Sequence, residues 1–111
     1  MTWLPQYPEL TPKMRSLLER MARVHRPPMH LQPAQEARAA YEGAADVLEL
    51  PRRPLARVED VRLPTRDGEQ LPARVYQATP SAAGVLLYLH GGGFTIGSID
   101  THDILCRELA G

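Results

Sequence analysis

The sequence predicts an α/β fold in which helices precede an antiparallel strand pair, and a buried strand then leads through a glycine loop into a last helix. Three observations predict it. Apolar residues recur at helical spacing over residues 12–50. An Asp67-Gly68 turn separates two short extended segments. An apolar run without alternation, Val85–Leu89, precedes three consecutive glycines, Gly91, Gly92 and Gly93.

The first helix is expected after an irregular arm at residues 1–10. Thr11 is suited to be its N-cap, and Pro12 to be its first helical residue, because proline lacks the N–H that this position leaves unbonded. Pro27-Pro28 is expected to stop it. Its apolar face consists of Met14, Leu17, Leu18, Met21 and Val24.

A second helix is expected to begin near Pro33 and to end before Pro51. Gly43 lies inside it and costs about 1 kcal/mol relative to alanine, which weakens its middle. Its apolar face consists of Ala37, Ala40, Tyr41, Ala44 and Leu48.

The segment Arg52-Arg53-Pro54 is interpreted as a solvated linker between two domains, residues 1–54 and 55–111. After it, residues 58–63 and Leu71–Tyr76 are predicted to be antiparallel strands joined by the Asp67-Gly68 turn. A surface loop over residues 79–84 follows the second strand.

The run Val85–Leu89 is predicted to be a strand buried on both faces, which delivers the glycines to the edge of a sheet. Glycines give a loop little side-chain cover and allow φ values that are closed to other residues. Backbone N–H groups can therefore turn toward a ligand, so the loop suits an anion, either a phosphate or a developing oxyanion.

A last helix is predicted after Ser98, with Asp100 as its N-cap and Asp103 as an acidic residue of its first turn. Cys106 lies inside the helical pattern and is interpreted as a packing residue rather than a reactive thiol. The apolar face of this helix consists of Ile104, Leu105 and Leu109.

Composition limits the class of partner. Basic and acidic residues balance at 13 each over 111 residues, which disfavours nucleic acid and anionic membranes as partners. No apolar run reaches the roughly 20 residues that cross a bilayer, and the N-terminal residues do not resemble a signal peptide. Cys106 is the one cysteine, so no disulfide forms within the chain, and a cytoplasmic location is expected. The oligomeric state stays open.

The segment Leu89–Ala110 resembles the oxyanion loop and first sheet helix of the hormone-sensitive-lipase-like esterases, a branch of the α/β-hydrolases. The resemblance rests on His-Gly-Gly-Gly-Phe at residues 90–94, on Gly97-Ser98 and on the Asp-Thr-His-Asp start of the helix. The order of the earlier elements also matches, because the two helices of residues 1–54 correspond to that family's cap.

The resemblance implies the N-terminal portion of an α/β-hydrolase fold. It also implies hydrolysis of carboxylic esters, as small-molecule substrates, by a serine–histidine–aspartate triad without a cofactor or metal. It implies that Gly92 and Gly93 donate their backbone N–H groups to the oxyanion of the tetrahedral intermediate. It also implies that His90, Gly91 and Phe94 shape the loop.

One part of the family pattern is missing. The three serines, Ser16, Ser81 and Ser98, do not lie in a Gly-x-Ser-x-Gly elbow, so no nucleophile, acid or base of the triad is predicted in this chain. We therefore expect an N-terminal fragment that is inactive alone. In that fold a later strand pairs with Val85–Leu89, and without it the apolar run is an aggregation hazard.

Other functions stay open at this point. A non-catalytic remnant of an esterase is one, and a phosphate-binding strand–loop–helix module is another. The phosphate loop lacks its lysine, and Ile96 stands where a dinucleotide loop requires glycine. We interpret His90 as a residue that shapes the loop rather than as a general base. Ser98 is not predicted to be a nucleophile, because no base and orienting acid lie at a recognisable spacing from it. Capping and solvation are favoured over a metal site for His102, Asp100 and Asp103.

Overall fold

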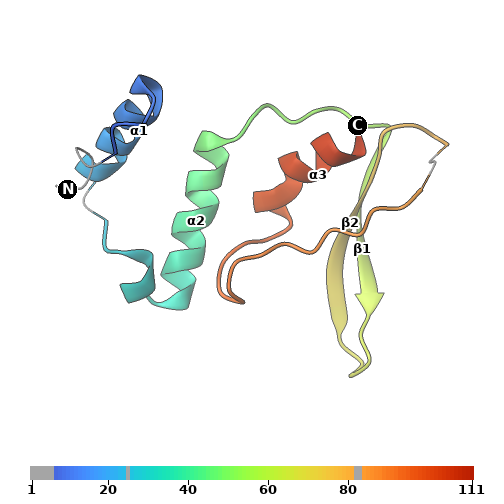
Figure 1. Ribbon diagram of the computed structural model, residues 1–111. Coiled ribbons are helices and arrows are strands. Elements are labelled where there is room, and N and C mark those ends of the chain that lie inside the picture. Colours follow the sequence, from blue (N-terminus) through green and yellow to red (C-terminus); the bar gives the residue numbers. More distant parts are fainter. Residues whose placement is uncertain (1–6, 25, 82–83) are drawn as a thin grey trace. The chain divides into compact units, whose positions relative to one another are not determined.

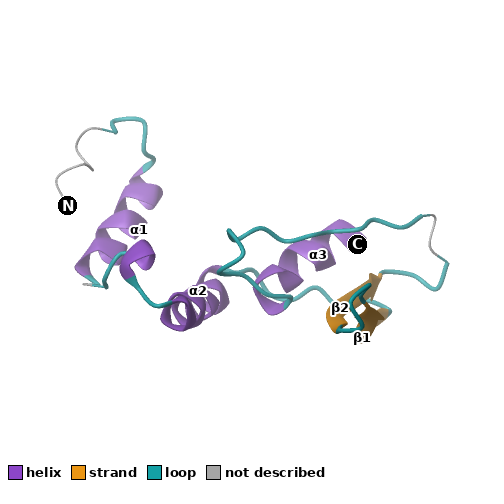
Figure 2. Cartoon of the chain, turned by 90° about the horizontal axis from the view of Figure 1, so that it is seen from below, coloured by secondary structure: helices purple, strands orange, loops and turns teal. Residues whose placement is uncertain are grey.

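The computed structural model describes residues 7–24, 26–81 and 84–111 and contains two compact units, Met1–Gln32 and Pro33–Gly111. Figures 1 and 2 show its helices and its single pair of strands. Residues 1–6 of the expected arm and residues 82–83 of the expected loop lie outside the described residues.

The first unit contains helix α1, Pro12–Arg23, and the short 3-10 helix η2, Met29–Leu31. The start of α1 is as predicted, because the Thr11 hydroxyl accepts a hydrogen bond of 3.2 Å from the Met14 N–H, and Pro12 follows the cap. Helix α1 ends at Arg23, earlier than the predicted stop at Pro27-Pro28. Val24 is extended, and its N–H donates to the Met21 carbonyl at 3.2 Å.

The second unit begins with helix α2, Ala34–Leu48, which lies within the bounds predicted from Pro33 and Pro51. Ala37 is 2% exposed and is the one buried apolar residue in the described part of the chain. Gly43 is exposed on this helix, and no heavy atom lies within 4 Å of the place where a Cβ would stand.

Strands β1, Arg57–Pro64, and β2, Gln70–Gln77, form the predicted antiparallel hairpin. The pairing runs from Arg57 opposite Gln77 to Pro64 opposite Gln70. At the turn, Gly68 has a φ of +89°, and the Thr65 N–H donates to the Glu69 carbonyl at 2.9 Å. The Thr65 hydroxyl also donates to the Asp67 carboxylate, and this bond lowers the pKa of that carboxyl group.

The prediction of a buried strand at Val85–Leu89 is wrong for this chain. The segment pairs with no strand among the described residues, and its side chains are exposed, Val85 to 99% and Leu87 to 79%. A central strand owes its burial to neighbouring strands and to helices on its faces. In the described residues β1 and β2 pair only with each other, and the run is not part of their sheet. This agrees with the expectation that the strand that would pair with the run is missing.

The last helix, α3, spans Asp103–Ala110 and follows the 3-10 helix η3, Asp100–His102. Asp100 is not its N-cap, contrary to prediction. The Ser98 hydroxyl accepts from the Thr101 N–H at 3.2 Å, and the Thr101 hydroxyl accepts from the Ser98 N–H at 2.8 Å. This reciprocal pair satisfies donors at the start of the helical segment and leaves the Asp100 carboxylate to bond elsewhere.

The Asp103 carboxylate joins three parts of the second unit. Its side chain is 1% exposed, and its oxygens accept from Arg52 at 3.0 Å and from Arg107 at 2.7 Å. They also accept from Arg74 and from the Tyr76 hydroxyl, each at 2.9 Å. Arg52 precedes β1, and Arg107 lies one turn further along α3 than Asp103. Arg74 and Tyr76 are two residues apart on β2, so their side chains lie on the same face of the strand.

One prediction about these residues is therefore wrong. Asp103 was expected to serve in capping and solvation, yet its side chain is 1% exposed and accepts from the Arg74 guanidinium at 2.9 Å. Asp100 accepts from the same guanidinium at 2.9 Å, but its side chain is exposed, as solvation requires. The linker arginines are exposed, as predicted, but Arg52 also pairs with Asp103, and the Arg53 carbonyl accepts from Arg107 at 3.0 Å. Sequence spacing carries no sign of these contacts because they join distant segments.

Charge compensation sets the ionisation of this cluster. Burial opposes the charge of Asp103, but hydrogen bonds from Arg107, Tyr76 and Arg74 together outweigh it and lower its pKa to about 2. The pKa of Arg74 is raised, chiefly by its hydrogen bond to Asp60, the residue directly opposite on β1. The Arg74 Nε–H donates to Asp60 Oδ1 at 2.5 Å. Burial and the bond to the Asp103 carboxylate raise the pKa of Tyr76.

Among the described helices, none combines the length and the apolar character needed to cross a bilayer.

Replacing Gly43 with alanine is expected to stabilise the chain by about 1 kcal/mol, because alanine favours the helix and the site has open space. Urea unfolding followed by circular dichroism at 222 nm measures the change. Gly68→Ala is the matched control and should destabilise, because its φ of +89° strains any residue with a Cβ. A loss of stability in Gly43→Ala would contradict the description of α2.

The Asp103 cluster predicts a stability that falls in acid. The folded pKa of about 2 lies below the ordinary 3.8, so the carboxylate stabilises the fold above about pH 4. That contribution, about 2 kcal/mol, should be lost as the pH falls toward 2.

Asp103→Asn should cost about 3–5 kcal/mol at pH 7, because the surrounding arginines lose their buried anion. It should also remove most of the acid dependence in urea titrations between pH 5 and 2. Asp46→Asn, at an exposed residue of α2 without an ion pair among the described residues, is the control. Equal effects of the two changes would refute the role given to Asp103.

Candidate functional site

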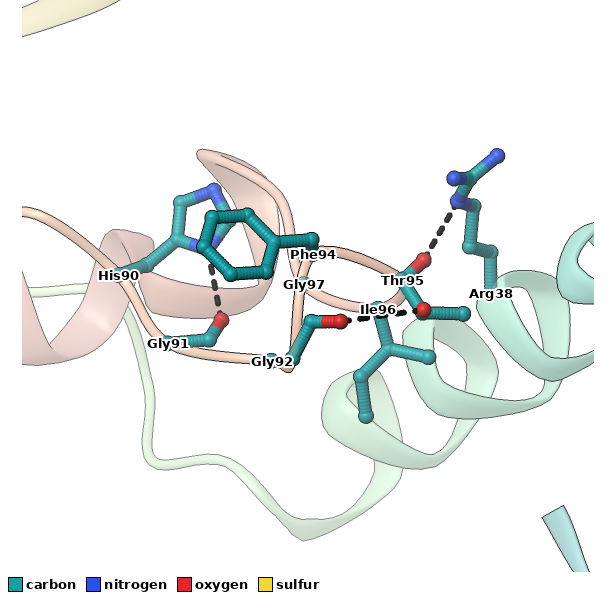
Figure 3. Close-up of a pocket in the computed structure, with 9 residues that line it drawn as sticks. Arg38, His90, Gly91, Gly92, Phe94, Thr95, Ile96 and Gly97 are labelled. Carbon is teal, nitrogen blue, oxygen red and sulfur yellow. Dashed lines mark hydrogen bonds between the residues drawn. The ribbon is translucent and has the colours of Figure 1, made fainter. Parts of the chain in front are cut away.

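The glycine loop borders an open depression of about 430 Å³. Residues 90–97 line it from one segment, and Arg38 lines it from α2 (Figure 3). The Arg38 Nε–H donates to the Thr95 carbonyl at 2.5 Å and so joins α2 to the loop across 57 positions of sequence. One side of the depression is thus formed by Arg38, a residue far from the loop in the sequence.

A tight turn centred on the Gly92 carbonyl gives the loop its shape. That oxygen accepts from the N–H groups of Thr95 and Ile96, each at 3.0 Å. Gly92 has a φ of +134°, and a Cβ there would lie 1.9 Å from the Ile96 carbonyl oxygen. Glycine is therefore required at this position both by conformation and by space.

The direction of the Gly93 N–H follows from this turn. The Gly92 carbonyl and the Gly93 N–H belong to one planar trans peptide, in which the two groups point in opposite directions. Because the carbonyl is held inside the turn by Thr95 and Ile96, the Gly93 N–H points out of the turn. Gly93 itself has a φ of +59° and open space around the position of a Cβ.

His90 orients the preceding peptide in the same way. Its Nδ1 lies 2.8 Å from the Gly91 carbonyl oxygen, and because a carbonyl can only accept, Nδ1 carries the hydrogen (Figure 3). The Gly92 N–H belongs to the peptide of that carbonyl and points away from the imidazole ring. Two successive N–H groups, of Gly92 and Gly93, are thus oriented through the carbonyls behind them.

These two N–H groups donate to no acceptor among the described residues. The lining of the depression contains the cationic Arg38 and no aspartate or glutamate. Unpaired donors beside a cation, with no carboxylate in the lining, favour negative charge on a ligand. The composition of the lining thus favours an anion over a cation as ligand, and it contains no serine or cysteine.

The structure brings together the five loop residues singled out in the sequence. His90, Gly91, Gly92, Gly93 and Phe94 all line the depression. Phe94 has a φ of +59° and a fully exposed side chain.

The other candidates have structural partners. The Ser98 hydroxyl accepts from the Thr101 N–H, and Cys106 lies on α3, where burial and the Asp103 charge raise the pKa of its thiol. Within residues 7–24, 26–81 and 84–111, no group of histidine, cysteine and carboxylate side chains is arranged to hold a metal ion. Arg38 was missed from the sequence because it looks like any charged residue on the outer face of a helix.

Comparison with known proteins relates the loop to esterases. Residues 86–111 match a family model for the alpha/beta hydrolase fold. The chain is 45% identical over 87 residues to ethyl acetate hydrolase from Pseudomonas putida, which covers 75% of this chain and 27% of that protein. It is 49% identical over 53 residues to the carboxylic ester hydrolase LipN of Mycobacterium tuberculosis, covering 45% of this chain and 13% of LipN.

Solved structures give the same relationship. The chain is similar to an ester hydrolase from the metagenome of Lake Arreo, with a TM-score of 0.77 and 34% identity over 91% of this chain and 34% of that one. It is also similar to the hyperthermophilic esterase of Pyrobaculum calidifontis, with a TM-score of 0.73 and 34% identity over 91% of this chain and 32% of that one. The chain thus spans about a third of the length of these enzymes.

Gly92→Ala is expected to open the turn, because a Cβ at that position would overlap the Ile96 carbonyl. Amide hydrogen exchange measured by NMR should then quicken at Thr95 and Ile96, whose N–H groups lose the Gly92 carbonyl. Gly84→Ala, at a site with open space and no positive φ, is the control and should leave these amides unchanged. Unchanged exchange in Gly92→Ala would refute the turn.

Proposed function

Because this chain belongs to the hormone-sensitive-lipase-like esterases of the α/β-hydrolase fold, we propose that it serves in the hydrolysis of carboxylic esters. The substrate class is a small ester. The Pseudomonas putida relative is an ethyl acetate hydrolase, which supports this choice. The reaction needs no cofactor or metal.

Gly92 and Gly93 are proposed to stabilise the oxyanion that forms when a nucleophile attacks the ester carbonyl. The observation that carries the proposal is the orientation of their N–H groups by the hydrogen-bonded carbonyls of Gly91 and Gly92. Such donors meet a charge that develops mainly in the transition state, so they lower the barrier rather than tighten substrate binding. Pre-oriented dipoles also avoid reorganisation during the reaction.

The neighbouring residues are proposed to shape this loop. His90 holds the Gly91 carbonyl, and Phe94 continues the turn at a positive φ. In the same proposal residues 1–54 are the cap helices with their linker, and residues 55–111 begin the catalytic domain. Arg38 of α2 then joins the cap to the oxyanion loop through Thr95.

The proposal assigns oxyanion stabilisation to this chain and no triad member. None of its three serines lies in a Gly-x-Ser-x-Gly elbow. We also propose a cytoplasmic location, supported by the single Cys106, and no nucleic-acid partner, supported by the balance of 13 basic and 13 acidic residues.

The 111-residue chain alone is expected to show no turnover of p-nitrophenyl acetate, because oxyanion donors without a nucleophile create no tetrahedral intermediate. Release of p-nitrophenolate, followed at 400 nm against a buffer blank, tests this. Saturable turnover that persists through repurification would show that the chain contains a nucleophile.

The loop itself is testable in a chimera, in which this chain replaces the matching segment of the Pseudomonas putida ethyl acetate hydrolase. We expect the chimera to hydrolyse esters. Gly92→Ala should lower its kcat about 10²- to 10³-fold with little change in KM, because an oxyanion donor is displaced. Gly84→Ala is the control. An active chimera whose kcat survives Gly92→Ala would overturn the oxyanion role.

A further inference from the structure

We propose that His102 is a positioning residue of the glycine loop, which acts on the Gly92 N–H through the ring of His90. The catalytic meaning of this inference rests on the proposed function, but the contacts that carry it do not. His102 ends η3, immediately before α3, and its ring stacks on the ring of His90. It thus joins the helical segment to the start of the loop.

The ring of His102 is held in place from its own segment. Its Nδ1 lies 3.2 Å from the Ser98 carbonyl oxygen and 3.0 Å from the Thr101 hydroxyl oxygen. Because the Ser98 carbonyl can only accept, Nδ1 carries the hydrogen and donates. The next residue is Asp103, whose bonds to β2 fix the start of α3. His102 is therefore a platform anchored to the rest of the unit.

The ring of His90 is exposed, but three contacts restrict it. Its centroid lies 5.2 Å from that of His102, with 21° between the ring planes. A Cβ built on Gly97 would lie 2.9 Å from His90 Nδ1, so the backbone at Gly97 closes against the ring. The third contact is the bond of 2.8 Å from Nδ1 to the Gly91 carbonyl.

The consequence for the loop is geometric. Rotation of the His90 ring would break its bond to the Gly91 carbonyl and would release the peptide that carries the Gly92 N–H. His102 removes that freedom by stacking, and Gly97 leaves room for the ring because it has no side chain. Among the described residues His102 makes no hydrogen bond to Gly92 or Gly93, so its effect passes through His90.

Kinetics of the chimera test the assignment. His102→Ala should lower kcat about tenfold with KM little changed, whereas His102→Phe, which keeps a stacking ring, should retain most of kcat. In a His90→Ala background the His102→Ala change should have no further effect, because its route to the loop is gone. His30→Ala, at an exposed residue of η2, is the control.

A second measurement does not depend on activity. In the 111-residue chain labelled with ¹⁵N-glycine, His102→Ala should shift and broaden the Gly92 amide resonance, while Gly68 on the hairpin turn stays unchanged. His102→Phe should restore the Gly92 resonance. An inactive parent chimera would count against the proposed function alone, since the Gly92 resonance still decides the role of His102.

Two results would overturn the assignment of His102. One is a Gly92 resonance that His102→Ala leaves unchanged. The other is an equal loss of kcat from His102→Ala with and without His90, which would place its effect on another route.

Discussion

The second unit of this chain depends on one buried carboxylate. Asp103 accepts hydrogen bonds from the linker, from β2 and from the next turn of α3, and its side chain is 1% exposed. Ala37 is the one buried apolar residue among the described residues, so packing of apolar side chains does little to hold these segments together. Ionic hydrogen bonds are directional, so they determine which face of α3 meets the hairpin. A buried carboxylate also needs every one of its partners, because an uncompensated charge there is costly.

The geometry of the glycine loop depends on contacts with η3, the segment that leads into α3. The exchange of hydrogen bonds between Ser98 and Thr101 attaches the end of the loop to the helical segment, and the rings of His90 and His102 attach its beginning. Between these points the carbonyls of Gly91 and Gly92 are occupied, so the N–H groups on the opposite sides of their peptides point outward. The orientation of two donors thus depends on hydrogen bonds made behind them, a requirement of any site that must be pre-oriented for a developing charge.

The run Val85–Leu89 illustrates how the same sequence can be suited to burial and still be exposed. Its composition is that of a strand covered on both faces, yet among the described residues it pairs with neither strand of the hairpin, and its side chains are exposed. The chain spans about a third of the length of the esterases it resembles in structure. Such a run also pairs readily with other exposed strands, which is why unpaired apolar segments promote aggregation.

The sequence by itself determined the elements that local chemistry specifies. The Thr11-Pro12 helix start, the Asp67-Gly68 turn and the esterase-like loop at residues 90–94 each depend on neighbouring residues, so they could be predicted. Only the tertiary structure decided the contacts between distant segments. Asp103 resembles a solvated residue of a first turn, and Arg38 resembles an exposed helical arginine, until the fold brings their partners near. Hydrogen bonds across 29 and 57 positions leave no periodicity in a sequence, because the energy that selects them arises only after the segments have met.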